Sequence, residues 1–200
     1  MTENPGRLHQ CVLEHTVTAS RFSPYQFATL RTFARAPLLA TAPMKRLLLD
    51  CFMDTKRRFG LTVAGYVVLD NHAHFLFSIP AEYECTAILN DLRTTHLRAW
   101  RKSTPLLERD TPGNALFWEP GSECRSVYSP DDLRAHLDFI HYDPVRHGLA
   151  TRAADYRWSS LPERIAQGHY PEYWGEIGPP AAISRVEREC AQCRHGDRKP

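Results

Sequence analysis

The spacing of apolar and polar residues predicts a chain that mixes helices and strands. Two stretches repeat their apolar positions every three or four residues, the period of an amphipathic helix: 43–59 and 85–102. Three stretches are short, rich in β-branched and aromatic residues, and typical of strands: 25–33, 61–69 and 73–79. Asp70 and Asn71 lie between the last two strands, where their residue types favour a tight turn, so these strands are expected to form a hairpin.

The second half of the chain contains the clearest helix start. In "SPDDLRAHLDFIHYDP", Ser129 suits an N-cap, Pro130 suits the first turn, and two aspartates follow where the helix dipole favours negative charge. Pro144 is expected to end this helix, because proline disfavours a helical conformation in the residue before it. The remaining pattern is weaker. It predicts an irregular stretch over 103–128 that contains two short strands, at 116–118 and 124–128, and then a short helix over 161–167.

Length and composition indicate one ordinary globular domain. The 200 residues are 42% hydrophobic and 24% charged, and a domain typically holds about 100 to 200 residues. We expect an N-terminal extension over 1–24, the domain over 25–177 and a polar, loosely ordered tail over 178–200. No apolar run approaches the roughly 20 residues that span a bilayer, and the N-terminus lacks the apolar core of a signal peptide, so we expect a cytoplasmic protein with no membrane partner.

Cysteine and charge content change this picture only a little. The six cysteines are irregularly spaced in a chain that is long enough to fold without cross-links, so we expect reduced thiols rather than a disulfide framework. The formal net charge is +2 at pH 7, which by itself does not indicate a nucleic-acid partner. Lysine and arginine are nevertheless concentrated in two segments: 45–59 and 92–103.

Two histidines lie two residues apart inside an apolar stretch, "YVVLDNHAHFLFSIP" over 66–80. Successive side chains of a strand point to opposite faces, so His72 and His74 are expected to share one face, about 6.6 Å apart along the strand. Two neighbouring imidazoles can bind a divalent metal ion. The alternative is a pair of half-buried histidines at the mouth of a hairpin, and the spacing alone does not distinguish the two.

The surrounding sequence resembles a known family. The 66–80 segment resembles the histidine, hydrophobic, histidine strand of the HUH nucleases, in particular of the REP-associated tyrosine transposases within the IS200-like, single-tyrosine group. Further segments resemble the family in the same order and at similar spacing: "LFWEP" (116–120), "HLDFIHYDPVRHGL" (136–149), "WSS" (158–160) and "GHYPEYWG" (168–175). The resemblance covers residues 25–175. It implies an α+β fold, an antiparallel sheet with helices packed on one face, like the ferredoxin-like core of HUH nucleases.

The resemblance also implies a chemistry. In this family the two histidines and a polar side chain from the third helix hold Mg²⁺ or Mn²⁺, and a tyrosine on that helix attacks the phosphate to give a covalent 5′-phosphotyrosine. His72 and His74 correspond to the two histidines. Helix geometry places Asp143, one turn past residue 139 and about 40° round the helix, as the third ligand, although it could also cap the helix end. The three ligands would also tolerate Zn²⁺.

The nucleophile departs from the family pattern. Phe139 occupies the position of the family tyrosine, and phenylalanine has no oxygen with which to attack. An engineered knockout, a naturally inactive descendant and a shifted nucleophile all remain open. Tyr142 is the candidate for a shifted nucleophile, although it lies about 60° round the helix from Phe139 and relatives often have an aromatic residue there. Asp70 is a second departure, since relatives have proline before the histidines.

Several further residues are candidates for DNA contact. Basic side chains on the first two helices could neutralise phosphates of a single-stranded or hairpin substrate, or form the solvated faces of those helices: Arg57, Arg58, Arg93, Arg98, Arg101 and Lys102. His136 could bind phosphate or lie half-buried in the core. Cys190, Cys193 and His195 have spacing that suggests zinc, but a structural zinc needs four ligands and no second pair follows.

The expected function is therefore metal-dependent cleavage and strand transfer of single-stranded DNA that carries a hairpin, by a monomer or a homodimer. Phe139 leaves turnover by this chain in doubt. One alternative is a catalytically silent protein that binds such DNA hairpins or regulates the element. Another is a metal-binding enzyme of unrelated chemistry, such as a metallohydrolase, which would be active without any tyrosine.

Overall fold

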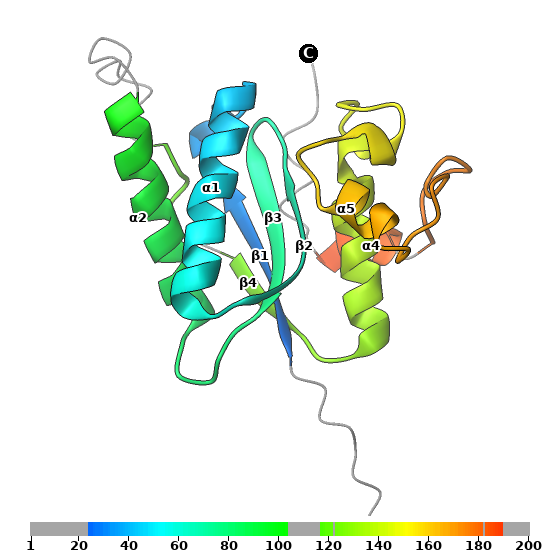
Figure 1. The fold of residues 1–200 in the computed structure, drawn as a ribbon, viewed down its shortest axis with the longest axis horizontal. Coiled ribbons are helices and arrows are strands. Elements are labelled where there is room, and N and C mark those ends of the chain that lie inside the picture. Colours follow the sequence, from blue (N-terminus) through cyan, green and yellow to red (C-terminus); the bar gives the residue numbers. More distant parts are fainter. Residues whose placement is uncertain (1–23, 104–116, 122, 182, 190–200) are drawn as a thin grey trace, which may run out of the picture.

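A four-stranded antiparallel sheet forms the centre of the domain (Figure 1). The computed structural model describes residues 24–103, 117–121, 123–181 and 183–189. The strand order is β2-β3-β1-β4, with these bounds: β1 Tyr25–Arg31, β2 Thr62–Val68, β3 His72–Ser78 and β4 Glu123–Val127. The predicted strands and the hairpin turn between β2 and β3 are confirmed. Of the strand predicted near 116–118, the described part forms a single bridge, from Trp118 to Thr32.

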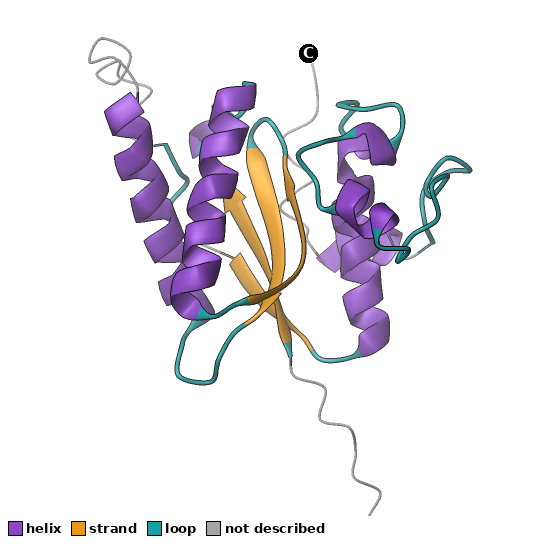
Figure 2. Cartoon of the chain, viewed as in Figure 1, coloured by secondary structure: helices purple, strands orange, loops and turns teal. Residues whose placement is uncertain are grey.

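Helices cover both faces of the sheet (Figure 2). On one side lie the two long helices of the first half of the chain: α1 Ala42–Phe59 and α2 Cys85–Ser103. On the other side lie the helices of the second half: α4 Pro130–Arg146, α5 Leu161–Ala166 and α6 Ile183–Glu189. Two 3₁₀ turns complete the described elements: η1 Phe33–Arg35 and η2 Ala153–Asp155. The α+β class is confirmed. The expectation that the helices pack on one face of the sheet is wrong, because α4 packs on the opposite face from α1 and α2.

Strand β3 explains why both faces need a cover. Its residues 72–77 are all buried, whereas a strand with one solvated face would alternate. Ala73, Phe75 and Phe77 belong to the core that α1 and α2 complete. Leu76 belongs to a second core with Phe139 and other residues of α4. The two histidines alternate with the first set, and therefore face α4.

Helix α4 begins as expected and ends later. The Ser129 side chain accepts a hydrogen bond from the backbone N–H of Asp132 at 3.1 Å, which confirms the predicted N-cap. Pro144 does not end the helix, which continues to Arg146. A proline in the last turn removes one backbone donor near the point where the helix ends anyway. The continuation matters because residues three apart on a helix are neighbours, which brings Arg146 beside Asp143.

A close approach between β2 and α4 sets the position of that helix. The strand pairing of β2 shifts register between Val63 and Gly65. A Cβ at Gly65 would lie 2.7 Å from Cδ2 of Leu137 on α4, closer than real contacts allow. Glycine at this position therefore lets α4 pack directly against the sheet beside the histidine strand.

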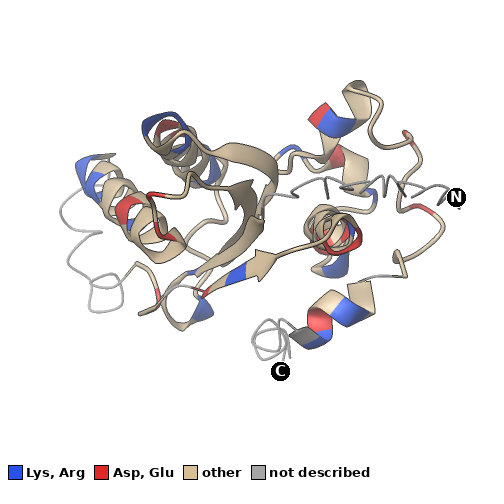
Figure 3. Ribbon diagram, turned by 90° about the horizontal axis from the view of Figure 1, so that it is seen from below, with Lys and Arg blue, Asp and Glu red and all other residues tan. Residues whose placement is uncertain are grey.

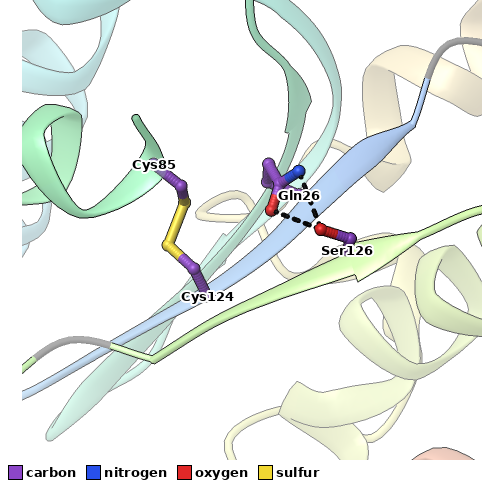
Figure 4. Close-up of a disulfide and its surroundings, with 4 residues drawn as sticks. All are labelled: Gln26, Cys85, Cys124 and Ser126. Atoms are coloured by element: carbon purple, nitrogen blue, oxygen red, sulfur yellow. Dashed lines mark hydrogen bonds between the residues drawn. A yellow bond between two sulfur atoms is a disulfide. The ribbon is translucent and has the colours of Figure 1, made fainter. Parts of the chain in front are cut away.

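Two cysteines form a disulfide across the α1 and α2 side of the sheet (Figure 4). Cys85 at the start of α2 is bonded to Cys124 of β4, while Gln26 and Ser126 are hydrogen-bonded across β1 and β4 nearby. Among the described residues Cys51 is a free, buried thiol. The expectation of reduced thiols is wrong for Cys85 and Cys124. Their pairing depends on tertiary contact across 39 residues, which sequence spacing does not reveal.

The stretch expected to form a loosely ordered tail contains a packed helix. Ile183 and Val186 of α6 are buried against the second core, and α6 contacts α4. Arg185 forms an ion pair with Asp132 at 3.3 Å, across these two helices. Residues 183–189, within the stretch expected to form a tail from 178, therefore form a helix that packs on α4, and the domain bounds stay a prediction.

Candidate metal centre

Three buried side chains from two elements converge on one point. Strand β3 contributes His72 and His74, and helix α4 contributes Asp143. Nε2 of His72 lies 3.4 Å from Oδ2 of Asp143, and Nε2 of His74 lies 3.5 Å from the same oxygen. One potential ligand atom from each residue lies within 4.8 Å of the others. The structure thus brings together the three residues predicted as ligands.

The two imidazoles are oriented by partners on their other nitrogen. His72 Nδ1 donates to Oδ1 of Asn71 at 2.6 Å, and His74 Nδ1 is hydrogen-bonded to the Thr29 hydroxyl at 2.9 Å. Within the described chain, both Nε2 atoms and Oδ2 of Asp143 are buried without a hydrogen-bond partner. Buried polar atoms are nearly always satisfied, so three unsatisfied ones facing each other are the expected arrangement around a bound cation. The residues therefore fit a divalent metal ion.

The protonation states also suit a metal. Burial lowers the pKa of His72 to about 4, against the opposing effect of Asp143, so this imidazole is neutral at pH 7. Burial disfavours the carboxylate of Asp143, but its contacts with His147 and His72 and its electrostatic interaction with His74 hold its pKa well below the ordinary value. Metal ions bind neutral imidazole and ionised carboxylate. Two nitrogens and one carboxylate oxygen suit Mn²⁺, Mg²⁺ or Zn²⁺.

The second oxygen of Asp143 is held by neighbours that sequence reasoning missed. Oδ1 accepts hydrogen bonds from Arg146, with Nε at 2.9 Å and a terminal nitrogen at 2.8 Å. Nε2 of His147 lies 3.4 Å from the same oxygen. The helix period would have identified Arg146, three residues past Asp143, had the helix been extended through Pro144. Thr29 could have been identified from the alternation in β1, but its pairing with His74 needs the strand register.

The residue at the tyrosine position of the resembling family lies against this centre. Phe139 is fully buried, and its ring centroid is 5.5 Å from that of His74 and 6.1 Å from that of Phe27. The guanidinium carbon of Arg146 lies 4.9 Å from the centroid of the Phe139 ring. A side chain at position 139 is thus adjacent to the metal ligands, although phenylalanine offers no oxygen.

Tyr142 lies elsewhere. Its side chain is half-buried, and its ring centroid is 6.4 Å from that of Trp174. A Cβ at Gly175 would lie 3.3 Å from Cδ2 of Tyr142. Tyr142 therefore packs on a segment that contributes none of the three candidate ligands, and its role as a substitute nucleophile stays a prediction.

His136 borders a pocket next to the centre. Its Nδ1 is 2.8 Å from the backbone oxygen of Asp132, and its ring centroid is 4.8 Å from that of Phe27, which stacks on His74. The pocket has a volume of about 210 Å³, and Thr29 and Arg125 also line it. Contact between His136 and DNA stays a prediction.

The six basic residues predicted to contact DNA lie on α1 and α2, where Figure 3 colours the ribbon blue at lysine and arginine. These helices cover the sheet face opposite the three candidate ligands. Arg57 pairs with Asp54, Arg58 pairs with Asp91, and Arg93 donates to the backbone oxygens of residues 119 and 121. The structure does not bring them together with the candidate metal centre, and their contact with DNA stays a prediction.

Two further predictions concern other parts of the chain. In the described part of the chain, no helix is long and apolar enough to cross a membrane. The cysteines and histidine of the C-terminal zinc-like spacing, at 190, 193 and 195, lie outside the described residues.

Sequence comparisons find related proteins. A family model described as "Transposase IS200 like" matches residues 25–141. A REP-associated tyrosine transposase from Escherichia coli (strain K12) is 23% identical over 154 residues, covering 76% of this chain and 85% of that protein. A Haemophilus influenzae protein of the same group is 26% identical over 134 residues, covering 63% of this chain and 73% of that protein.

A solved structure shares the fold. The structure of a REP-associated tyrosine transposase bound to a REP hairpin matches with a TM-score of 0.65 at 21% identity, covering 80% of this chain and 90% of that chain. The expected α+β architecture with an antiparallel sheet is confirmed by this likeness.

Proposed function

The chain belongs to the family of IS200-like transposases, and from this premise we propose that it acts on hairpin-bearing single-stranded DNA at a divalent metal centre formed by His72, His74 and Asp143. The observation that carries the proposal is the convergence of two Nε2 atoms and one carboxylate oxygen, all buried and without hydrogen-bond partners in the described chain. The hairpin substrate is supported by the similar structure that contains a REP hairpin.

The protein contributes orientation and charge. Asn71 and Thr29 fix the imidazoles so that each Nε2 faces Asp143, and Arg146 fixes the carboxylate. A bound Mg²⁺ or Mn²⁺ would polarise the phosphoryl oxygens and stabilise the leaving oxygen. The burial of the ligands keeps water from competing for their unpaired atoms.

Strand cleavage needs a nucleophile at this centre. In a chain with tyrosine at position 139, the phenolate oxygen would attack the phosphorus, forming a phosphorus–oxygen bond to tyrosine while the bond to the 3′ oxygen breaks and leaves a free 3′-hydroxyl. The covalent bond conserves the phosphodiester energy for rejoining. Phe139 has the position next to His74 but lacks the oxygen.

Phe139 therefore favours a second candidate function, a protein that binds hairpin DNA without cutting it. The packing of Tyr142 on Trp174 supports this candidate over a shifted nucleophile. A metal-dependent hydrolase of unrelated chemistry would instead cut DNA or another substrate with water and would form no covalent adduct.

The test is a denaturing-gel assay for a covalent protein–DNA adduct. Labelled hairpin-bearing single strands from beside the gene are incubated with Mn²⁺ and one of four proteins: the natural chain, Phe139→Tyr, Tyr142→Phe and Phe139→Tyr combined with His72→Ala. A native gel measures binding of the same DNA in parallel.

The proposal expects an adduct with Phe139→Tyr, none with the natural chain or the His72→Ala combination, and hairpin binding by the natural chain. An adduct with the natural chain that disappears in Tyr142→Phe would assign the nucleophile to Tyr142. Hairpin binding without any adduct would support the second candidate. No hairpin binding by any of the four proteins would contradict both.

A further inference from the structure

An arginine links the candidate metal centre to the C-terminal helix. Nε and one terminal nitrogen of Arg146 hold Oδ1 of Asp143, at 2.9 and 2.8 Å. The other terminal nitrogen contacts Oε1 of Glu187 on α6 at 2.5 Å. The same guanidinium lies over the ring of Phe139. One planar group thus contacts a metal ligand, the position of the family nucleophile and the C-terminal helix.

The contacts to Asp143 determine which carboxylate oxygen faces the histidines. A carboxylate can rotate about its last bond, and a rotation would exchange the two oxygens or turn both away from the imidazoles. Two hydrogen bonds from one planar guanidinium to the same oxygen, Oδ1, resist that rotation, because turning Oδ1 away would break both of them. Oδ2 is left directed at the Nε2 atoms of His72 and His74.

Charge would oppose cation binding if Arg146 were alone. A guanidinium beside a ligand carboxylate reduces the negative potential that attracts a metal ion. Glu187 places a second carboxylate on the far side of the guanidinium and balances its charge. The side chains of Arg146 and Glu187 are both mostly buried, so solvent screens this compensation only partly.

We propose that Arg146 is a positioning residue of the metal centre and that Glu187 of α6 balances the charge of Arg146. In this way the C-terminal helix strengthens metal binding. The inference rests on the proposed metal centre. Glu187 lies 44 residues from Asp143 in the sequence, and it is linked to this ligand through its ion pair with Arg146.

Helix α6 offers a matched control for this role. Arg185, two residues before Glu187, joins the same helix to α4 through its ion pair with Asp132. Ile183 and Val186 supply the buried apolar contact. Removal of the Arg185 pair weakens docking of α6 without touching the Arg146 guanidinium.

The experiment measures Mn²⁺ affinity of the metal-free, full-length chain by the electron paramagnetic resonance signal of free Mn²⁺. The variants are Arg146→Gln, Arg146→Lys, Glu187→Gln, Arg185→Gln and His72→Ala, and the melting temperature of each is recorded without metal. Loss of a group that orients a metal ligand typically costs about 10- to 100-fold in metal affinity. We expect a loss of that size for Arg146→Gln and a loss of several-fold for Glu187→Gln.

The remaining variants separate orientation from packing. Arg146→Lys should recover part of the affinity, since an ammonium can donate to Oδ1 but cannot also reach Glu187. Arg185→Gln should leave the affinity within about twofold, even if it lowers the melting temperature as much as Glu187→Gln does, because the pair of Arg185 with Asp132 does not involve the Arg146 guanidinium. A purely structural role of Arg146 would change the melting temperature and not the affinity at a temperature where every variant is folded.

Three outcomes would overturn the inference or its premise. If Arg146→Gln binds Mn²⁺ as the natural chain does while His72→Ala does not, the positioning role is wrong and the metal centre stands. If Glu187→Gln and Arg185→Gln lose affinity equally, α6 acts by docking alone and the role of Glu187 is wrong. If His72→Ala binds Mn²⁺ as well as the natural chain, the metal centre itself is wrong, and the proposed function with it.

Discussion

The guanidinium carbon of Arg146 lies 4.9 Å from the centroid of the Phe139 ring, so a charged group covers this ring. Phe27 and His74 contact the same ring, which is fully buried. Phenylalanine packs here as a core residue. It provides apolar packing beside the candidate metal centre.

Tyrosine at position 139 should therefore reduce stability. Phe139→Tyr adds a hydroxyl to a ring that has no exposed edge, and we expect the free energy of unfolding of the metal-free protein to fall by about 1 to 2 kcal/mol. Urea titration measures the change. Tyr142→Phe, at a half-buried ring on the same helix, is the control and should stay within about 0.5 kcal/mol. A Phe139→Tyr protein more stable than the natural chain would show that the hydroxyl finds a hydrogen-bond partner.

Divalent metal should stabilise the folded chain. A ligand that binds the native state alone adds about 2.7 kcal/mol to the free energy of unfolding at 100 times its dissociation constant. We expect Mn²⁺ to raise the melting temperature in a concentration-dependent way and chelator to reverse it. His72→Ala should abolish the increase, while His169→Ala, at an exposed histidine outside the centre, should retain it. An equal increase in both variants would place the ion elsewhere.

Much of the candidate site could be predicted from local periodicity. His72 and His74 share a face because strand side chains alternate, and Asp143 follows Phe139 by one turn of a helix. These relationships depend on a few neighbouring residues. That the strand and this helix hold one metal ion between them was implied by the family resemblance, and the structure brings the three side chains together.

The other features were missed because they depend on tertiary contacts or, for Arg146, because a proline was expected to end the helix. Arg146 was missed because Pro144 was taken as the helix end, whereas the helix continues two residues past it, to Arg146. Thr29 meets His74 through the register of two strands far apart in sequence. Cys85 and Cys124 meet through packing of α2 on the sheet. The apolar stretch around His72 and His74 indicated that β3 is buried on both faces. It did not indicate which helices cover which face, so the face covered by α4 could not be predicted.

Acid should weaken the fold through buried histidines away from the metal centre. Burial lowers the pKa of His96 to about 4 and that of His141 to about 3, with Arg164 and Arg134 adding to the shift of His141. Between pH 6.5 and about 4 the unfolded chain binds protons that the folded chain does not, so stability falls as the pH falls. Each histidine contributes a slope of up to about 1.4 kcal/mol per pH unit.

The pH slope can be assigned to a residue. Urea titration at several pH values between 4 and 6.5 should give a smaller slope for His96→Gln than for the natural chain, by about the contribution of one histidine. His169→Gln should leave the slope unchanged, since that side chain is exposed. Equal slopes for the natural chain and His96→Gln would mean that His96 is protonated in the folded state.

The disulfide should stabilise the oxidised protein. It closes a loop with a sequence separation of 39 residues, and the chain-entropy model predicts about 3 to 4 kcal/mol for a loop of that size. Cys85→Ser should lower the free energy of unfolding by about this amount under oxidising conditions, and reductant should lower that of the natural chain to the same value. Cys51→Ser, at the free buried thiol, should remain sensitive to reductant. A natural chain insensitive to reductant would show that the two thiols are not bonded in solution.

Asp70 is expected to stabilise a buried lysine. Nζ of Lys45 is buried and contacts Oδ1 of Asp70 at 2.5 Å and the backbone oxygens of Leu39 and Ala40 at 2.9 and 3.3 Å. Removal of one partner from a buried ion pair costs about 3 to 5 kcal/mol. Two carbonyl acceptors remain for Lys45 and Asp70 is partly exposed, so we expect Asp70→Ala to cost less than this, about 2 kcal/mol of unfolding free energy.

The matched control is Asp54→Ala, which removes the exposed ion pair between Asp54 and Arg57 on the same helix as Lys45. It should change the free energy of unfolding by less than about 1 kcal/mol, because solvent screens that pair. Urea titration of both variants separates the two effects. Equal changes in the two variants would show that Lys45 reaches water once Asp70 is removed. In that case Asp70→Asn, which keeps an oxygen acceptor without the charge, should be as stable as the natural chain.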